Sequence, residues 1–304
     1  MTDPLRAPPD DRSAAELLSF GVVNLDKPAG PSAHQVAGWV RDLANDAVED
    51  LEPDGPTVDR AAHAGTLDPK VTGCLPMLLG DATRMAQVFL EGRKEYVSVL
   101  ELHGPAPANL ESVLAEFEAP LYQKPPRKSA VSRRLRVREI HQLELLDLAD
   151  RQALIRIQCE SGTYVRKLCH DLGLALGTGA HMGHLRRTAT DPFDDASLEN
   201  LQSLTDALEF AREGDEECLR EIVQPAERAL THLPRVEIAP SAAREVATGA
   251  PVYAPGVIGA DDEIEDGALV ACFTPDGSAV CLGTMVGDPD ADSGEVIDLE
   301  RVLV

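Results

Sequence analysis

The backbone of this chain is most constrained in residues 63–74, a stretch that holds Gly65, Asp68, Pro69 and Gly73. Pro69 fixes its own φ and keeps Asp68 out of the helical region, while the two glycines permit turns that other residues resist. The pattern predicts a rigid loop that presents Asp68 outward, with no second carboxylate nearby in the sequence. A single, stiffly held acid suits a nucleophile better than an acid–base pair. An ordinary Asp-Pro turn fits the same spacing.

The composition predicts a globular protein of about two domains, since the chain has 304 residues and 43% hydrophobic content. No apolar run approaches the length of a membrane span, and the polar, proline-rich start is unlike a signal peptide. We therefore expect a cytoplasmic protein that does not contact membranes. The six cysteines form no CxxC pair, which argues against a zinc site and a disulfide framework.

The charge distribution is uneven. The formal net charge is −24, yet all six lysines lie within the first 167 residues. We interpret the acidic residues as a shell that keeps the protein soluble at high salt, a hypothesis that salt-dependent stability tests. The segment 124–138 gathers seven basic side chains: Lys124, Arg127, Lys128, Arg133, Arg134, Arg136 and Arg138. This pattern favours a patch that meets phosphates, although a basic loop that neutralises the protein's own acids fits as well.

The local patterns predict helices and strands in both parts of the chain. A loose arm is expected over residues 1–18, a strand over 21–25, and a helix that starts at Ser32, where Gln35 completes a capping box. An acidic surface insertion is expected over 46–59, strands over 94–102 and 153–159, a strand or loop over 180–188, and helices over 165–176, 198–208 and 221–230. Short strands follow residue 233, with a hairpin that pairs 269–273 with 279–283.

Three aromatic or basic side chains stand where they can face a cleft. Tyr96 lies near the start of one expected strand, and Tyr164 and Arg166 lie at a junction of strand, glycine and helix. A half-buried strand aromatic and a solvated helix start explain the same positions. His181 and His184 lack a cysteine or carboxylate at ligand spacing, so we expect no metal there.

Five segments in order together resemble the pseudouridine synthases of the TruB and dyskerin family. They are residues 21–32 with Lys27-Pro28, residues 63–74 with Asp68, Lys94-Glu95-Tyr96, residues 161–172, and residues 179–187. The glycine and proline pattern around Asp68 is more similar to the archaeal and eukaryotic dyskerin branch. The resemblance implies an α+β fold: a catalytic domain over residues 19–232 with a mixed, mainly antiparallel sheet and flanking helices, then a small all-β RNA-binding PUA domain over 233–304.

The resemblance also implies an activity, the isomerisation of uridine to pseudouridine in RNA without metal, ATP or other cofactor. Asp68 would be the nucleophile, whether it attacks C1′ or the base or assists glycal formation, with Tyr164 and Arg166 as catalytic partners. The expected substrate-binding residues are Tyr96, which stacks on the uracil, Lys27, which also braces the Asp68 loop, His63, Leu185, Arg186 and Arg187. The expected RNA-backbone patch is Lys124, Arg127, Lys128, Arg133, Arg134 and Arg136.

Three hypotheses about the biological role remain open at this level. The first is a catalytic subunit of an H/ACA ribonucleoprotein, in which a guide RNA selects uridines of rRNA and small protein subunits attach. The second is a stand-alone enzyme that modifies the T-loop uridine of tRNA. The third is a non-catalytic RNA-binding scaffold, which would not need the combination of Asp68, Tyr96, Tyr164 and Arg166.

Overall fold

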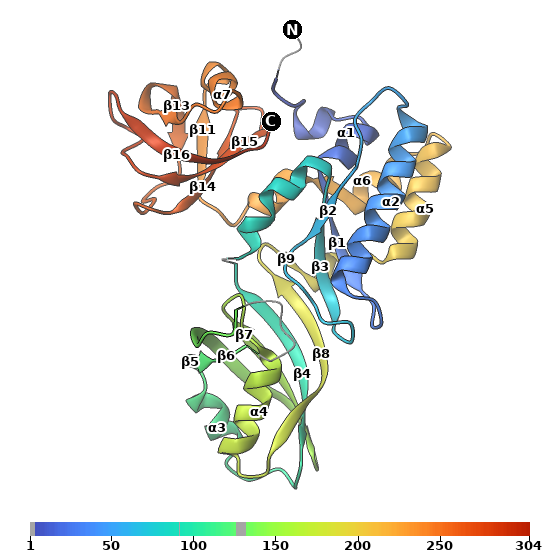
Figure 1. Cartoon of the computed structure of the whole chain (residues 1–304), viewed down its shortest axis with the longest axis vertical. Helices are drawn as coiled ribbons and strands as arrows, with labels where there is room; N and C mark the ends of the chain where they lie inside the picture. The colour runs from blue at the N-terminus through green and yellow to red at the C-terminus, as the bar shows by residue number, and fades with distance from the viewer. Residues whose placement is uncertain (1–3, 91, 126–131) are drawn as a thin grey trace.

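The computed structural model of the chain describes residues 4–90, 92–125 and 132–304, and its arrangement is shown in Figure 1. The α-helices are α1 (Ala14–Ser19), α2 (Ala33–Leu51), α3 (Leu110–Glu116), α4 (Val165–Ala175), α5 (Leu201–Arg212), α6 (Glu217–Ile222) and α7 (Pro240–Ala247). The 3-10 helices are η1 (Pro9–Asp11), η2 (Gly80–Leu90), η3 (Asp195–Ser197), η4 (Ala226–Leu230) and η5 (Ala254–Gly256).

The strands form two sheets. The first sheet contains β1 (Gly21–Lys27), β2 (Ala61–His63), β3 (Thr72–Leu79), β4 (Lys94–Leu102), β5 (Pro120–Gln123), β6 (Arg136–Ala149), β7 (Gln152–Cys159), β8 (Ala180–Thr190), β9 (Phe193–Asp194) and β10 (Val223–Pro225). The second contains β11 (Arg235–Ile238), β12 (Val252–Tyr253), β13 (Val257–Ala260), β14 (Leu269–Phe273), β15 (Ala279–Met285) and β16 (Glu295–Val302).

The first sheet has the strand order β10-β1-β3-β8-β4-β7-β6-β5, with β2 and β9 attached to β3 and β8. Among its described pairs, β3 and β8 run parallel and the others antiparallel. The predicted mixed, mainly antiparallel sheet with flanking helices is therefore confirmed. Since β3 carries the end of the Asp68 loop and pairs with β8, this parallel contact joins the two halves of the sheet beside the loop.

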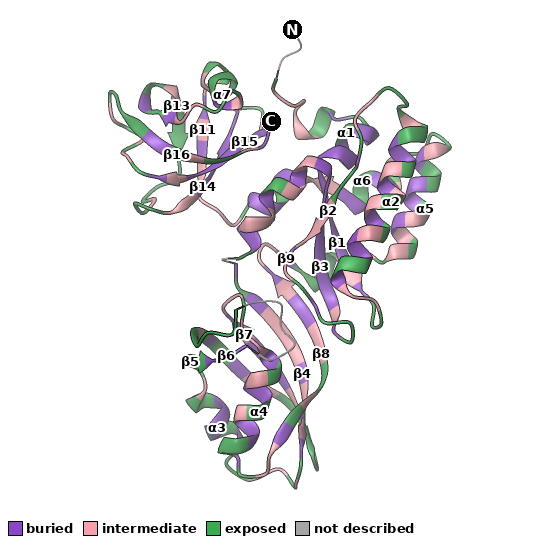
Figure 2. Cartoon of the chain, in the orientation of Figure 1, coloured by how far each residue is buried: buried purple, intermediate pink, exposed green. Residues whose placement is uncertain are grey.

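Two hydrophobic cores cover the two halves of this sheet. The helices α1, α2, α5 and α6 lie over the half that contains β1 and β3, and α3 and α4 lie over the half that contains β4, β6 and β7 (Figure 1). Buried residues concentrate where these helices meet the strands (Figure 2). Tyr96 and Leu185 pack against both cores, so they mark the seam between the two halves.

The second sheet has the order β12-β16-β15-β14-β11-β13 and carries the helix α7. The predicted hairpin is present as β14 and β15, with Cys272 opposite Cys281. The division proposed from the sequence, at about residue 233, falls between η4 and β11. A hydrophobic cluster crosses this division, because Phe20 and Val22 pack with Ala271, Phe273 and Leu303. The small domain therefore shares apolar surface with the larger one.

The prediction of a loose arm over residues 1–18 is wrong for its described part. Ser13 caps α1 with a full capping box, and α1 buries most of its residues. Arg12 is 2% exposed and donates to both carboxylate oxygens of Glu227, at 2.8 and 2.6 Å. Glu227 also accepts the N–H of Ala279 in β15, at 3.1 Å. The arm is ordered because its cations find partners on distant segments, which no local pattern reveals.

Two other predictions need correction. The helix α2 begins at the predicted Ser32–Gln35 capping box but continues to Leu51, so the expected insertion over 46–59 is partly helical. Ala47 and Val48 extend the buried stripe of α2, which explains why the helix persists into the acidic segment. The helix expected over residues 221–230 is instead the end of α6, the strand β10 and the turn η4, because β10 pairs with β1.

Candidate active site

The Asp68 loop is a tight connection between β2 and β3, which pair with each other. The carbonyl of Asp68 accepts the N–H of Val71 at 2.9 Å, so residues 68–71 form a turn with Pro69 in its second position. Gly73 adopts a φ of 97°, and a Cβ there would lie 2.1 Å from the carbonyl oxygen of Arg187. The local sequence therefore folds as predicted, and glycine is required where β3 meets β8.

Lys27 holds this loop from below. Its Nζ donates to the carbonyls of Val71, Pro28 and Pro69 at 2.8, 2.9 and 3.1 Å, and the side chain is fully buried. Burial lowers the pKa of Lys27 from its ordinary value, because the charged form is deprived of water. These contacts agree with the bracing role predicted for Lys27 and leave it no surface for direct substrate contact.

The prediction that Arg187 contacts the substrate is corrected by its burial. Its side chain is 1% exposed and donates to the carbonyls of Cys74, Ala64 and Gly65 at 2.7, 2.9 and 3.3 Å. It also hydrogen-bonds the side chain of Tyr96, its direct partner across β4 and β8. Arg186 and Arg187 are adjacent on a strand, so one of them must face inward. Strand alternation is the signal that could have separated the two arginines.

Tyr96 therefore shares a buried guanidinium with the base of the Asp68 loop. Its ring is half-buried at the seam between the two cores. Burial raises the pKa of Tyr96, and the hydrogen bond from Arg187 acts in the opposite direction without cancelling the effect. Tyr96 is thus a neutral phenol that is held in a fixed orientation.

Arg166 reaches Asp68 from the other half of the sheet. It is the second residue of α4, and its Nη2 forms an ion pair with Asp68 Oδ2. The two side chains remain 53% and 54% exposed, so the carboxylate is gripped and still open to solvent. The start of α4 is held in place as well, because Tyr164, its N-cap residue, donates its backbone N–H to Oε1 of the buried Gln123 at 2.8 Å. Gln123 was missed by the sequence analysis and carries no local signal.

His63 ends β2 and lies beside this network. Burial is the main cause that lowers its pKa, and the charges of Arg187 and His34 act in the same direction. Its Nδ1 is buried without a hydrogen-bond partner among the described residues. His63 is therefore held as a neutral ring at the entrance to the Asp68 loop.

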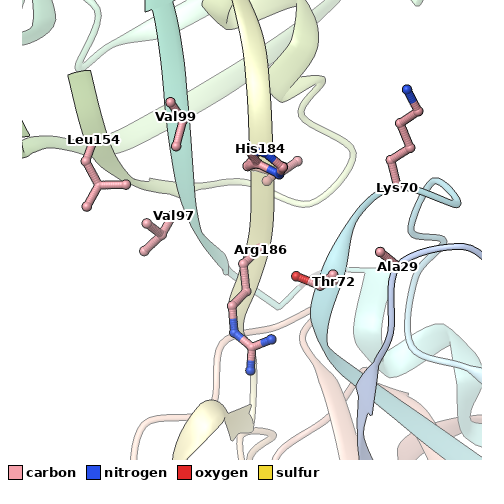
Figure 3. Close-up of a pocket in the computed structure, with 9 residues that line it drawn as sticks. Ala29, Lys70, Thr72, Val97, Val99, Leu154, His184 and Arg186 are labelled. Carbon is pink, nitrogen blue, oxygen red and sulfur yellow. The ribbon is translucent and has the colours of Figure 1, made fainter. Parts of the chain in front are cut away.

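Arg186 points to a different place. Both its terminal nitrogens pair with Asp26, at 2.9 and 3.0 Å. It lines a hollow of about 200 Å³ together with Lys70, Thr72, Val97, His184 and four further residues, Ala29, Val99, Leu154 and Leu185 (Figure 3). Asp68 is not among these lining residues. Leu185 and Arg186 thus stand beside the hollow, and Asp26 is a partner that the sequence analysis did not identify.

Four members of the basic patch lie on the described surface. Lys124, Arg133, Arg134 and Arg136 are exposed, and Arg133 Nε donates to the carbonyl of Pro125 at 3.0 Å. Arg127 and Lys128 lie outside the described residues. The exposed members precede or begin β6, whose partner strand β5 ends at Gln123. The patch therefore lies next in sequence to Gln123, which accepts the backbone N–H of Tyr164.

Within the described residues, no group of three or more His, Cys, Asp or Glu is placed to hold a metal ion. None of the described helices combines the length and the hydropathy of a transmembrane segment. The site instead consists of a single carboxylate, a guanidinium that grips it and a buried brace beneath it. Together with the mixed sheet and the smaller β domain, this arrangement fits the class that the sequence resemblance implies, enzymes that isomerise a nucleoside within RNA.

The comparisons with known proteins agree with this class. Family models match residues 56–109 (TruB family pseudouridylate synthase, N terminal domain), 166–231 (tRNA pseudouridylate synthase B C-terminal domain), 234–301 (PUA domain) and 4–37 (DKCLD domain). Two similar proteins, each named "Probable tRNA pseudouridine synthase B", come from Haloarcula marismortui and Pyrococcus abyssi. The first is 64% identical, covering 99% of this chain and 94% of its own length, and the second is 41% identical, covering 98% and 87%.

Solved structures agree as well. A Cbf5-Nop10-Gar1 complex contains a chain with a TM-score of 0.89 and 40% identity, covering 99% of this chain and 90% of that one. An H/ACA RNP bound to a substrate RNA gives a TM-score of 0.87 at 38% identity, covering 100% and 91%. The chain belongs to the TruB family of pseudouridylate synthases.

Proposed function

We propose that this enzyme uses Asp68 as the nucleophile that detaches a uracil from its ribose within RNA. The observation that supports this role is the exposed carboxylate of Asp68, ion-paired with Arg166 on a loop that Lys27 and Arg187 hold from below. The pair and the braces fix the position of the attacking oxygen before substrate arrives, which is the way enzymes lower the entropic part of a barrier.

A uridine in a folded RNA must leave its stack to reach this loop, at a cost of a few kcal/mol. Tyr96 offers a ring face at the seam of the two cores, and such stacking contributes about 1–3 kcal/mol per base. Leu185 packs at the same seam, and the neutral His63 borders the entrance. We propose these three side chains as the contacts of the flipped nucleotide.

The reaction balances without a cofactor. The Asp68 carboxylate attacks C1′, the N1–C1′ bond breaks, and the electron pair remains on the uracil, which stays in the pocket and turns. C5 of the uracil then attacks C1′ and releases the carboxylate. The C5 proton leaves and N1 gains a proton, so the product is an isomer of the substrate. We propose that Tyr164 accepts or relays the C5 proton.

The substrate RNA follows from the patch and the relatives. The exposed Lys124, Arg133, Arg134 and Arg136 favour the phosphate backbone, and in strong salt such contacts are screened. The relatives named tRNA pseudouridine synthase B support tRNA as one substrate. Within tRNA we propose the T-loop uridine as the target, as the sequence resemblance implies. The matches to the Cbf5-Nop10-Gar1 complex and to the H/ACA RNP support a second role, as a subunit of such a particle, and we propose that a guide RNA directs it to rRNA as the catalytic subunit. We place both roles in the cytoplasm.

The test is the release of tritium from an unmodified tRNA transcript labelled at C5 of uridine, with purified full-length chain. Asp68→Asn is expected to abolish release while the fold and the RNA affinity persist. The matched control is Asp171→Asn, which removes another cation-paired carboxylate, that of the Lys167–Asp171 pair on α4, and should keep normal activity. Turnover by Asp68→Asn would contradict the assignment. A wild-type chain that binds RNA and stays inactive, with and without guide RNA and partner subunits, would leave the scaffold role.

A further inference from the structure

The ends of β4 and β8 bring two histidines together. Glu101 stands opposite His181 and Leu102 opposite Ala180 in the register of these strands. His103 follows β4 directly, and its backbone N–H donates to the carbonyl of Gly179 at 3.0 Å. The pair therefore lies at the opposite end of β4 from Tyr96, and β4 runs toward the lower tip of the molecule in Figure 1.

The two imidazoles contact each other through nitrogen atoms. His103 Nε2 lies 3.0 Å from His181 Nδ1, the ring centroids are 5.2 Å apart, and the ring planes differ by 39°. Both side chains are exposed, so burial does not force them together. The backbone holds them instead: Gly179 has a φ of 70°, and a Cβ there would lie 2.9 Å from His103 Nδ1. Glycine at this position leaves the room that the ring of His103 occupies.

We propose that His103 and His181 form a binding site for a divalent transition metal of the Ni²⁺, Cu²⁺ or Zn²⁺ type. At the roughly 90° angles of an octahedral or square-planar ion such as Ni²⁺ or Cu²⁺, metal–imidazole bonds of about 2.0–2.1 Å place their two nitrogens about 3 Å apart, and a tetrahedral Zn²⁺ would separate them by about 3.4 Å. The observed separation is 3.0 Å, so small ring rotations bring both lone pairs onto one ion. When the metal binds, the shared hydrogen moves to the other nitrogen of its own ring, so each neutral ring carries one proton on the nitrogen that does not bind the metal.

The chemistry of the donors selects the metal. Imidazole nitrogens favour Ni²⁺, Cu²⁺ and Zn²⁺, whereas Mg²⁺ and Ca²⁺ require oxygen ligands. The described residues supply no third side chain placed as a ligand, and the Glu101 carboxylate accepts from Gln152 at 3.0 Å. Water would complete the coordination, which makes this an open site with two protein ligands. Spacing along the chain does not reveal the site, because His181 pairs with His103, which follows β4, and not with His184, which lines the hollow near Arg186.

The site uses none of the residues proposed for pseudouridine formation. A bound ion would link the end of β4 to the start of β8 and would stabilise the folded state by an amount that grows with the logarithm of the free metal concentration above the dissociation constant. Metal binding and uridine isomerisation can therefore succeed or fail independently.

Calorimetric titration of NiCl₂ into the full-length chain, with MgCl₂ in excess and no chelator, tests the site. We expect one saturable equivalent, whose affinity falls at least tenfold in His103→Asn and in His181→Asn. The matched control is His184→Asn, which removes an exposed histidine from the same strand and should bind Ni²⁺ normally. Binding that persists in both site variants, binding that is lost in His184→Asn, or the absence of saturable binding would each overturn the proposal.

Thermal unfolding gives a second, independent measurement. Ni²⁺ should raise the melting temperature of the wild-type chain, and EDTA should reverse the increase. The same addition should leave the melting temperature of His181→Asn unchanged, since that variant retains only one imidazole of the pair and so binds the ion much more weakly. An equal increase in both proteins would show that the ion binds elsewhere and would contradict the assignment.

Discussion

Replacing Arg187 separates its role as a brace from the substrate contact that the sequence predicted. In Arg187→Ala the carbonyls of Cys74 and Ala64 each lose a charged donor, and a buried acceptor left without its partner costs about 1–3 kcal/mol. The sum, about 2–6 kcal/mol, approaches the net stability of many domains, about 5–15 kcal/mol. Arg187→Lys is the better variant, because lysine keeps the charge but lacks the planar fork that reaches several acceptors.

For Arg187→Lys we expect the free energy of unfolding to fall by about 2–4 kcal/mol, measured by denaturant titration in concentrated KCl. Because the Asp68 loop and Tyr96 share this guanidinium, the single-turnover rate at saturating tRNA should fall about ten- to hundredfold. The dissociation constant for tRNA should stay within about twofold of the wild-type value, since the side chain does not reach the surface.

The control is Arg186→Lys on the same strand. Arg186 is 38% exposed and pairs with Asp26, so its substitution should change stability by no more than about 1 kcal/mol. The reasoning is refuted if Arg187→Lys keeps the stability and single-turnover rate of the wild-type chain but binds tRNA more weakly. That result would restore the substrate contact.

Three further predictions concern stability. Burial lowers the pKa of Lys94 from 10.5 to about 8, so the unfolded chain holds this proton more tightly. Relative to Lys94→Met, the free energy of unfolding of the wild-type chain should rise by up to about 3 kcal/mol between about pH 8 and pH 10. A difference in denaturation midpoint between the two proteins that stays constant over this pH range would contradict the prediction. Arg12→Met leaves Glu227 buried without its cation and should lower the free energy of unfolding by about 3–5 kcal/mol in thermal or denaturant unfolding. A change below about 1 kcal/mol would argue against a stabilising role for the Arg12–Glu227 ion pair. With a net charge of −24, the chain should unfold more readily as KCl is lowered, and equal stability at low and multimolar KCl would remove the high-salt hypothesis.

Local rules predicted the structure correctly where the contacts that determine it join residues close together in the sequence. The Asp68 turn closes between residues 68 and 71, the Ser32 cap closes with Gln35, and the strand over 94–102 follows from alternation. In each case the backbone preference of a proline, a cap or an alternating pattern decides the result within a few residues. The positions of lysine and arginine along the chain also showed where cations concentrate, though not which of these side chains are exposed.

Tertiary structure decided which side chains meet. Asp68 and Arg166 are 98 residues apart and come from different halves of the sheet, and Arg12 and Glu227 are 215 residues apart. The pairing of His103 with His181 depends on the register of β4 against β8, which a single-residue slip would change. Sequence spacing records only the neighbours along one strand or helix. The partner across a sheet is selected by the packing of the whole chain.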